Sequence, residues 1–238
     1  MGVQMVFKRY ELKYLITNQQ KNRIILSMQP YMKIDKYGRS TIRNLYFDTD
    51  NYRLIRRSLE KPVYKEKLRI RSYKPVEQND PVFVELKKKY RSVVYKRREA
   101  LTEKQCMDWL VKGGDMPKDN QICKEIDYFR KYYENLHPTV FLSYEREAFY
   151  SLDGSDFRVT FDENILARTE ELSLSSPVWG NSLLDDNLSL MEIKTSGGIP
   201  LWMTHLLTEQ QVFKSSFSKY GTAYEKIITN SERSMRYA

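Results

Sequence analysis

Charged side chains occupy every second position of two long strand-like runs in this 238-residue chain. Successive side chains of a β-strand point to opposite faces of the sheet, so each run would have one apolar or mixed face and one mainly basic face. The charged positions of these runs are Lys65, Lys67, Arg69, Arg71, Glu85, Lys87 and Lys89. Shorter runs of the same kind lie near the two ends, at Arg9, Glu11, Lys13 and at Glu192, Lys194. Several such strands favour a polar cavity built for a polyanion and its metal ions.

The composition agrees with an anionic partner. Forty Lys and Arg residues against 31 Asp and Glu residues give a formal net charge of +9. Cys106 and Cys123 are too few for a disulfide framework or a zinc site, so a reducing compartment is the simpler interpretation. The N-terminus lacks the apolar core of a signal peptide, and no run approaches the roughly 18 apolar residues of a membrane span. We therefore expect a cytoplasmic protein without direct membrane insertion.

The hydrophobic pattern predicts about eight antiparallel strands interrupted by helices, which is an α+β arrangement. The strands are expected at about 6–16, 40–47, 63–73, 81–90, 92–100, 138–150, 157–168 and 188–195. Helices are expected at about 17–28, 52–59, from 102, at 120–134, from 200 and at 219–230. Thr17 is a plausible N-cap, and Thr102 with Gln105 forms a capping-box pattern. Eight strands suffice to close a small barrel, here with polar residues inside and helices packed outside.

Several kinds of active site are absent from the sequence. There is no phosphate-binding Walker loop, no dinucleotide fingerprint and no Gly-x-Ser-x-Gly elbow. With only His137 and His205, a histidine-based triad or zinc site is improbable. Basic residues, carboxylates and a metal are nevertheless enough for phosphoryl transfer, which depends mainly on positioning and charge neutralisation. A module that binds polyanions without turnover is an alternative, and nucleic-acid binding is a weaker one because no RNA or DNA motif is present.

Eight short motifs, each weak alone, follow one another along about residues 5–228. They are Arg9-Tyr-Glu11-Leu-Lys13-Tyr, Leu45-Tyr-Phe-Asp48-Thr, Lys67-Leu-Arg69-Ile-Arg71, Val84-Glu85-Leu-Lys87, Tyr144-Glu-Arg146, Phe157-Arg158-Val-Thr-Phe-Asp162, Met191-Glu192-Ile-Lys194 and Phe217-Ser218-Lys219-Tyr. In this order they resemble the VTC domain, the polyphosphate polymerase domain of the triphosphate tunnel metalloenzyme (CYTH-like) superfamily. The resemblance implies a single domain over residues 1–238, of the stand-alone bacterial type, with a closed antiparallel tunnel. A separate membrane protein as partner is left open.

The resemblance also assigns roles to residues. The catalytic, phosphate-binding side chains would be Lys13, Arg69, Arg71, Lys87, Arg146, Arg158, Lys194 and Lys219. Further substrate contacts would come from Arg9, Lys67, Lys214 and Ser218. Glu192 would be the main ligand of Mn²⁺ or Mg²⁺, with Glu11 and Glu85 as further candidates. Glu85 could instead pair with a neighbouring base and fix the tunnel wall. Asp162 could orient an arginine or contact the metal, and most of the charge at Lys88, Lys96, Arg97 and Arg98 is interpreted as surface.

The activity implied by the resemblance is transfer of the γ-phosphate of ATP to a growing polyphosphate chain, with release of ADP. The partners would be ATP and inorganic polyphosphate, and no nucleic acid. A triphosphatase with the same tunnel fold is the enzymatic alternative. Related triphosphatases begin with Glu-x-Glu-x-Lys, whereas this chain has Arg9 at the first position, which exchanges a carboxylate for a phosphate clamp. Ser216 stands where the family often has a basic residue, and Lys214 is a candidate to compensate.

Overall fold

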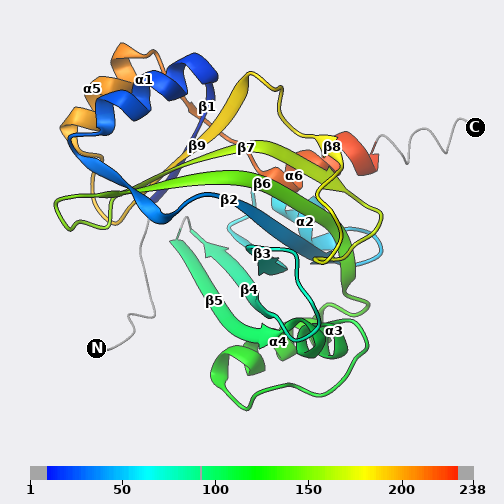
Figure 1. Cartoon of the computed structure of the whole chain (residues 1–238). Coiled ribbons are helices and arrows are strands. Elements are labelled where there is room, and N and C mark those ends of the chain that lie inside the picture. Colours follow the sequence, from blue (N-terminus) through cyan, green and yellow to red (C-terminus); the bar gives the residue numbers. More distant parts are fainter. Residues whose placement is uncertain (1–9, 92, 230–238) are drawn as a thin grey trace, which may run out of the picture. The chain divides into compact units, whose positions relative to one another are not determined.

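The computed structural model describes residues 10–91 and 93–229, and these form a sheet-dominated α+β structure (Figure 1). Its strands are β1 (Tyr10–Thr17), β2 (Met32–Asp48), β3 (Tyr64–Ser72), β4 (Pro81–Tyr90), β5 (Val93–Thr102), β6 (His137–Ser151), β7 (Arg158–Arg168), β8 (Asn181–Ser182), β9 (Leu188–Thr195) and β10 (Lys214–Ser215). Its helices are α1 (Asn18–Met28), α2 (Arg53–Leu59), α3 (Glu103–Leu110), α4 (Gln121–Tyr132), α5 (Leu201–Glu209) and α6 (Lys219–Ala223), which continues as a π-helical segment, η1 (Tyr224–Ile228). The predicted antiparallel α+β class is confirmed.

The strands follow the order β10-β1-β9-β7-β6-β2-β3-β4-β5, with β8 paired to β7. This order is a path with two ends, so a closed barrel is not confirmed over the part of the chain that the structure describes. The described residues form two compact units. Unit 1 comprises 10–41, 144–165 and 182–218, and unit 2 comprises 42–91, 93–143, 166–181 and 219–229. Strands β2, β6 and β7 contribute residues to both units.

In unit 1, one face of the strands is apolar and is covered by helices α1 and α5. The core there includes Ile16 of β1, Met191 and Ile193 of β9, Ile24 of α1 and Met203 of α5. Because side chains alternate along a strand, the positions between these residues lie on the other face. The structure therefore confirms the predicted segregation of apolar and polar faces for this unit, where α1 and α5 lie together beside β1 (Figure 1).

Unit 2 repeats this arrangement with helices α3 and α4. Leu68, Val84 and Leu86 of strands β3 and β4 belong to a core that also contains Trp109 of α3 and Ile126 of α4. Burial of such side chains stabilises the unit by roughly 1.5–3 kcal/mol each. The basic alternate positions of β3 and β4 are thereby placed on the face away from this core.

The helix starts were predicted well because capping is a local signal. Thr17 and Thr102 both form capping boxes, in which the threonine hydroxyl accepts the backbone N–H of the residue three positions on. The strand expected at 40–47 is much longer, since β2 begins at Met32. The first half of β2 is largely exposed and polar, so the sequence there shows no alternation of apolar residues that would predict a strand. None of the helices that the structure describes is long and apolar enough to cross a membrane.

Candidate polyanion-binding site

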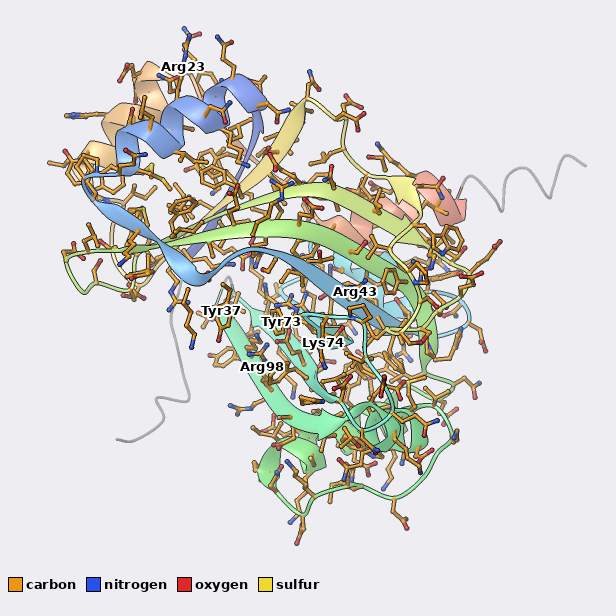
Figure 2. All side chains as sticks on the ribbon, viewed as in Figure 1. Arg23, Tyr37, Arg43, Tyr73, Lys74 and Arg98 are labelled. Carbon is orange, nitrogen blue, oxygen red and sulfur yellow. The ribbon has the colours of Figure 1, made fainter. Side chains whose placement is uncertain are left out.

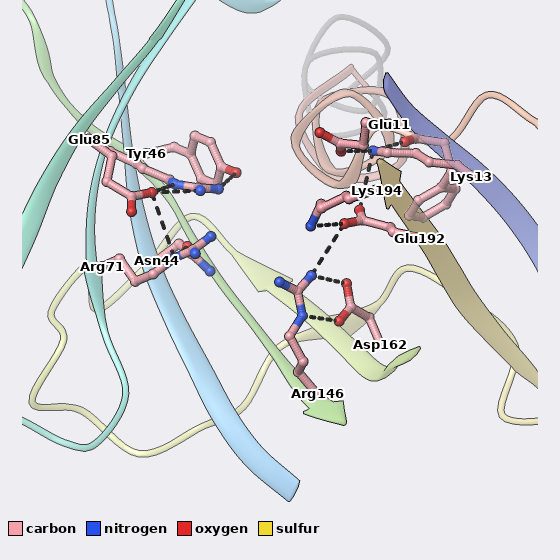
Figure 3. A network of polar contacts seen from close by, with 12 residues as sticks. Glu11, Lys13, Asn44, Tyr46, Arg71, Glu85, Arg146, Asp162, Glu192 and Lys194 are labelled. Carbon is pink, nitrogen blue, oxygen red and sulfur yellow. Dashed lines mark hydrogen bonds and ion pairs between the residues drawn. The ribbon is translucent and has the colours of Figure 1, made fainter. Parts of the chain in front are cut away.

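Unit 1 carries a group of linked charges on its polar face, here called the Glu192 cluster (Figure 3). Its members are Glu11, Lys13, Arg146, Asp162, Glu192 and Lys194. Strand pairing brings them together, because Lys13 lies opposite Glu192 and Glu11 lies opposite Lys194. Glu192 is 4% exposed. Its carboxylate approaches Lys194 Nζ at 3.1 Å, Arg146 Nη2 at 3.4 Å and Lys13 Nζ at 3.5 Å.

Asp162 forms a bidentate interaction with Arg146. Arg146 Nε and Nη2 donate to the two carboxylate oxygens of Asp162 at 2.6 and 2.7 Å. Burial alone would lower the pKa of the Arg146 guanidinium, but Asp162 and Glu192 together raise this pKa well above its ordinary value. Arg146 is therefore a permanent cation with a fixed orientation, and Asp162, whose role the sequence left open, orients this arginine.

Lys13 of strand β1 places its ammonium group between the carboxylates of Glu11 and Glu192. Lys13 Nζ lies 3.8 Å from Glu11 Oε1 and 3.5 Å from Glu192 Oε1, and it donates to the carbonyl oxygen of Phe217 at 2.7 Å. Carboxylate oxygens suit a hard cation such as Mg²⁺ or Mn²⁺. Within residues 10–91 and 93–229, no three Asp, Glu, His or Cys side chains are grouped so that they could hold a metal alone. Glu192 and Glu11 thus fit a metal whose other ligands are substrate oxygens and water.

The remaining residues predicted for this unit are arranged less uniformly. Arg158 of β7 is exposed and lies opposite Lys194, so both share the face of the Glu192 cluster. Lys214 pairs with Tyr14, a core residue, whereas Ser215 pairs with Lys13. The register therefore places Lys214 on the opposite face from Lys13.

Unit 2 carries a second group, here called the Glu85 cluster, which consists of Tyr46, Arg69, Arg71, Glu85, Lys96 and Arg98. Glu85 is only 1% exposed. Arg69 Nε and Nη2 donate to Glu85 Oε2 at 2.9 and 2.7 Å, and Arg69 Nη1 donates to the Tyr46 hydroxyl at 2.9 Å (Figure 3). On the other oxygen, Glu85 Oε1 forms ion pairs with Lys96 Nζ at 2.6 Å and Arg98 Nε at 2.9 Å.

These neighbours change the pKa values within the Glu85 cluster. Burial would raise the pKa of Glu85, but the charges of Arg69, Arg71 and Lys96 outweigh burial and hold this pKa well below its ordinary value. Burial lowers the pKa of Lys96 to about 8, against the opposing effect of Glu85. Glu85 is therefore a permanent anion that orders cations around it.

Next to the Glu85 cluster, lysines face one another across three strands. Lys67 pairs with Lys87, Lys87 pairs with Lys96, and Lys65 pairs with Lys89. Like charges directly opposite each other in an antiparallel pair are destabilising. Burial and then the charges of Lys89 and Lys87 lower the pKa of Lys65, which is a sign of this crowding. We call these five residues the lysine rows.

Lys219 and Ser218 lie at the start of the last helical segment. Lys219, the first residue of α6, is buried and belongs to unit 2, whereas Ser218 belongs to unit 1 and is half-buried. Next in the chain, Tyr220 stacks on Tyr46 with 4.7 Å between ring centroids, and its hydroxyl donates to Asp48 at 2.9 Å. Arg9 lies outside the described residues.

Some members of these clusters were not predicted from the sequence. Lys96 and Arg98 were interpreted mostly as surface charge, yet both contact the buried Glu85 carboxylate. Tyr46 was part of a recognised motif but received no role. The signal that could have found them is register, since Arg98 lies opposite Glu85 and Tyr46 lies opposite Arg69. Register depends on how the strands pair, which alternation within one strand does not specify.

These charged faces can be compared with known protein families. The model of the VTC domain matches residues 8–228, a range that takes in nearly all of both units. This chain belongs to the VTC domain family. The resemblance inferred from the motifs is thus confirmed, and it places the chain in the triphosphate tunnel superfamily, whose proteins depend in general on a divalent metal.

The VTC chain also matches solved structures of other proteins. One is a proposed adenylate cyclase from Bacillus halodurans, 15% identical with a TM-score of 0.55, and the match covers 90% of this chain and 94% of that one. Another is a proposed adenylate cyclase from Vibrio parahaemolyticus, 13% identical with a TM-score of 0.48 over 92% of this chain and 98% of that one. At 15% identity, the likeness to the Bacillus halodurans structure concerns the fold alone. No curated protein matches the sequence.

Proposed function

We propose that this VTC domain is a metal-dependent polyphosphate polymerase that transfers the γ-phosphate of ATP to the end of an inorganic polyphosphate chain. ADP is the second product. The family match supports a protein that acts on a triphosphate. The proposal places the reaction in the cytoplasm, where ATP is available.

The observation that carries the proposal is the set of lysine rows beside the Glu85 cluster. Lys67, Lys87 and Lys96 face one another across strands β3, β4 and β5, although such contacts are unfavourable in the free protein. A linear polyanion would contact several of these side chains at once. Lysine supplies a compact charge and arginine a two-pronged contact, so together they suit successive phosphates.

The chemistry requires little covalent help from the protein. A terminal oxygen of the chain, which is already anionic, attacks the γ-phosphorus of ATP, and a new P–O bond forms. The bond from that phosphorus to the β–γ bridging oxygen breaks, and its electron pair leaves with ADP. No general base is needed, which fits a chain with only two histidines. The basic side chains would position both reactants and neutralise their charge.

Glu192 and Glu11 would hold the divalent cation in this proposal. When bound, Mg²⁺ or Mn²⁺ supplies positive charge at phosphate oxygens that the protein alone does not provide. Arg146, fixed by Asp162, and Lys13 lie beside these carboxylates and would bind the phosphates around the ion. Glu85 is surrounded by four basic side chains, and we assign it the positioning role.

The direct test is to incubate the purified protein with ATP and Mn²⁺ or Mg²⁺ and to separate the products on a gel stained for polyphosphate. We expect a ladder of growing chains with release of ADP, and loss of both in Glu192→Gln. Glu125→Gln is the matched control, because Glu125 lies on α4 and pairs with Arg97 and Lys88 on the helix-covered face. Free phosphate without a ladder would indicate a triphosphatase, and polyphosphate binding without turnover would indicate a binding module.

A further inference from the structure

Two aromatic rings and an arginine form a compact group at one end of the polar face of unit 2. The Arg98 guanidinium lies 3.9 Å from the centre of the Phe83 ring, and Arg98 Nη2 donates to the Tyr73 hydroxyl at 2.7 Å. The Tyr73 and Phe83 rings meet edge to face with 5.9 Å between their centroids. Tyr73 is 46% exposed, so one side of the group is accessible to a ligand (Figure 2).

This aromatic group continues the basic face directly. Phe83 lies opposite Arg71 in the register, and Tyr73 follows directly after Ser72, the last residue of β3. Arg98 links the aromatic pair to the Glu85 cluster. Its Nε forms an ion pair with Glu85, and its Nη2 donates to the Tyr73 hydroxyl. On this face of β3 the order is Lys67, Arg69 and Arg71, and Tyr73 lies just beyond the end of the strand. Same-face neighbours on a strand are spaced by about 6.6 Å.

We propose that Tyr73, Phe83 and Arg98 form a nucleobase subsite for the nucleoside triphosphate. A nucleoside triphosphate has the matching order of groups: a chain of anionic phosphates, a ribose spacer and a flat ring. Aromatic side chains and the guanidinium plane bind such rings by stacking. The lysine rows, at the opposite end of β3 from Tyr73, then bind the γ-phosphate end of the nucleotide and the polyphosphate chain.

The inference deepens the proposed function and rests on it, so its test must separate the base from the phosphates. Calorimetry with Mg²⁺ present would compare an ATP analogue that has an imido group between its β- and γ-phosphates with inorganic tripolyphosphate, which has no base. We expect Tyr73→Leu to lose about thirtyfold in affinity for the analogue, the middle of the range for one stacked base. Its affinity for tripolyphosphate should stay within twofold of wild type.

Three further variants keep the result interpretable. Tyr73→Phe retains the ring and should bind the analogue nearly as well as wild type, whereas Phe83→Leu should weaken it like Tyr73→Leu. Tyr128→Leu removes an exposed tyrosine of α4 and should change neither affinity. Equal losses for both ligands, or no loss for either, would overturn the nucleobase subsite while leaving the phosphate-binding function intact. Failure of the wild type to bind either ligand would overturn the proposed function as well.

Discussion

Glu85 places a carboxylate in a buried position, 1% exposed, and surrounds it with cations from neighbouring strands. A buried charge is costly unless it is paired, and removing one partner leaves the others uncompensated. In this cluster the glutamate holds Arg69, Lys96 and Arg98 at fixed positions against their mutual repulsion. The role of Glu85 is thus to position the basic side chains of this face rather than to bind a ligand itself.

The first prediction concerns the stability that Glu85 provides. Glu85→Gln should reduce the free energy of unfolding at pH 7 by about 3 kcal/mol, because it removes the buried anion that pairs with Arg69, Arg71, Lys96 and Arg98. The lowered pKa of Glu85 means that this contribution is complete above the ordinary glutamate pKa of about 4.3 and is lost as the pH falls towards the lowered value. Urea denaturation at several pH values should therefore show the difference between variant and wild type shrinking below about pH 4.

Asp108→Asn is the control for this measurement. Asp108 pairs with Lys104 and Lys112 on the exposed side of α3, where ion pairs add little. A loss for Glu85→Gln no greater than that for Asp108→Asn would show that the Glu85 cluster is not a cohesive unit.

The pKa of Lys96 is lowered to about 8, mainly by burial. A lowered lysine pKa means that the side chain is charged below about pH 8 and increasingly neutral above it, so its contact with an anion weakens as the pH rises. Wild-type affinity for tripolyphosphate should fall between pH 7 and pH 9. Lys96→Arg keeps its charge over this range and should lose less affinity. Parallel declines in the two proteins would count against a role for Lys96 in binding.

At the scale of elements, the parts that were predicted have local signals. Alternation along β3 and β4 specified which side chains share a face, and the threonine caps specified where α1 and α3 begin. The exposed first half of β2 lacks such a signal, because Asp35 and Gly38 are typical of a turn, yet this segment is extended and belongs to a strand that pairs with β6. Pairing between strands, not propensity within one, decided that element.

The two capping boxes give a prediction at this scale. Thr17→Ala and Thr102→Ala should each lower the free energy of unfolding by about 1 kcal/mol, since each removes a hydroxyl that accepts a helix N-terminal amide. Thr17→Ser and Thr102→Ser keep the hydroxyl and should recover most of this loss. Guanidinium denaturation measures all four, and an alanine variant as stable as wild type would show that the cap in question contributes nothing.

At the scale of the whole molecule, part of the net charge of +9 lies on the polar face of unit 2, where the Glu85 cluster and the lysine rows combine many basic side chains with one carboxylate. The Glu192 cluster of unit 1 instead balances three basic side chains with three carboxylates. Family motifs identified most members of the Glu192 cluster, including Arg146 and Glu192. For the Glu85 cluster the sequence identified half of the members, namely Arg69, Arg71 and Glu85. It missed Lys96 and Arg98, because their role comes from pairing with Glu85 across strands.

Ligand stabilisation should follow from this charge. Tripolyphosphate at about 100 times its dissociation constant stabilises the folded state by about 2.7 kcal/mol. For a chain of this size, that corresponds to a rise in melting temperature of about 5–10 °C. The rise should shrink as NaCl is added, because salt screens the contacts. Glucose 6-phosphate, with a single phosphate, is the control and should give little change; an equal rise with it would indicate non-specific anion binding.

ATP-driven chain growth can be followed through the fate of the γ-phosphate itself. Reactions with ATP labelled at the γ-phosphate and, separately, at the α-phosphate would be resolved by chain length. We expect the γ-label to enter chains longer than triphosphate in step with ADP release, and no α-label to enter them. Recovery of the γ-label only as inorganic phosphate would contradict the polymerase.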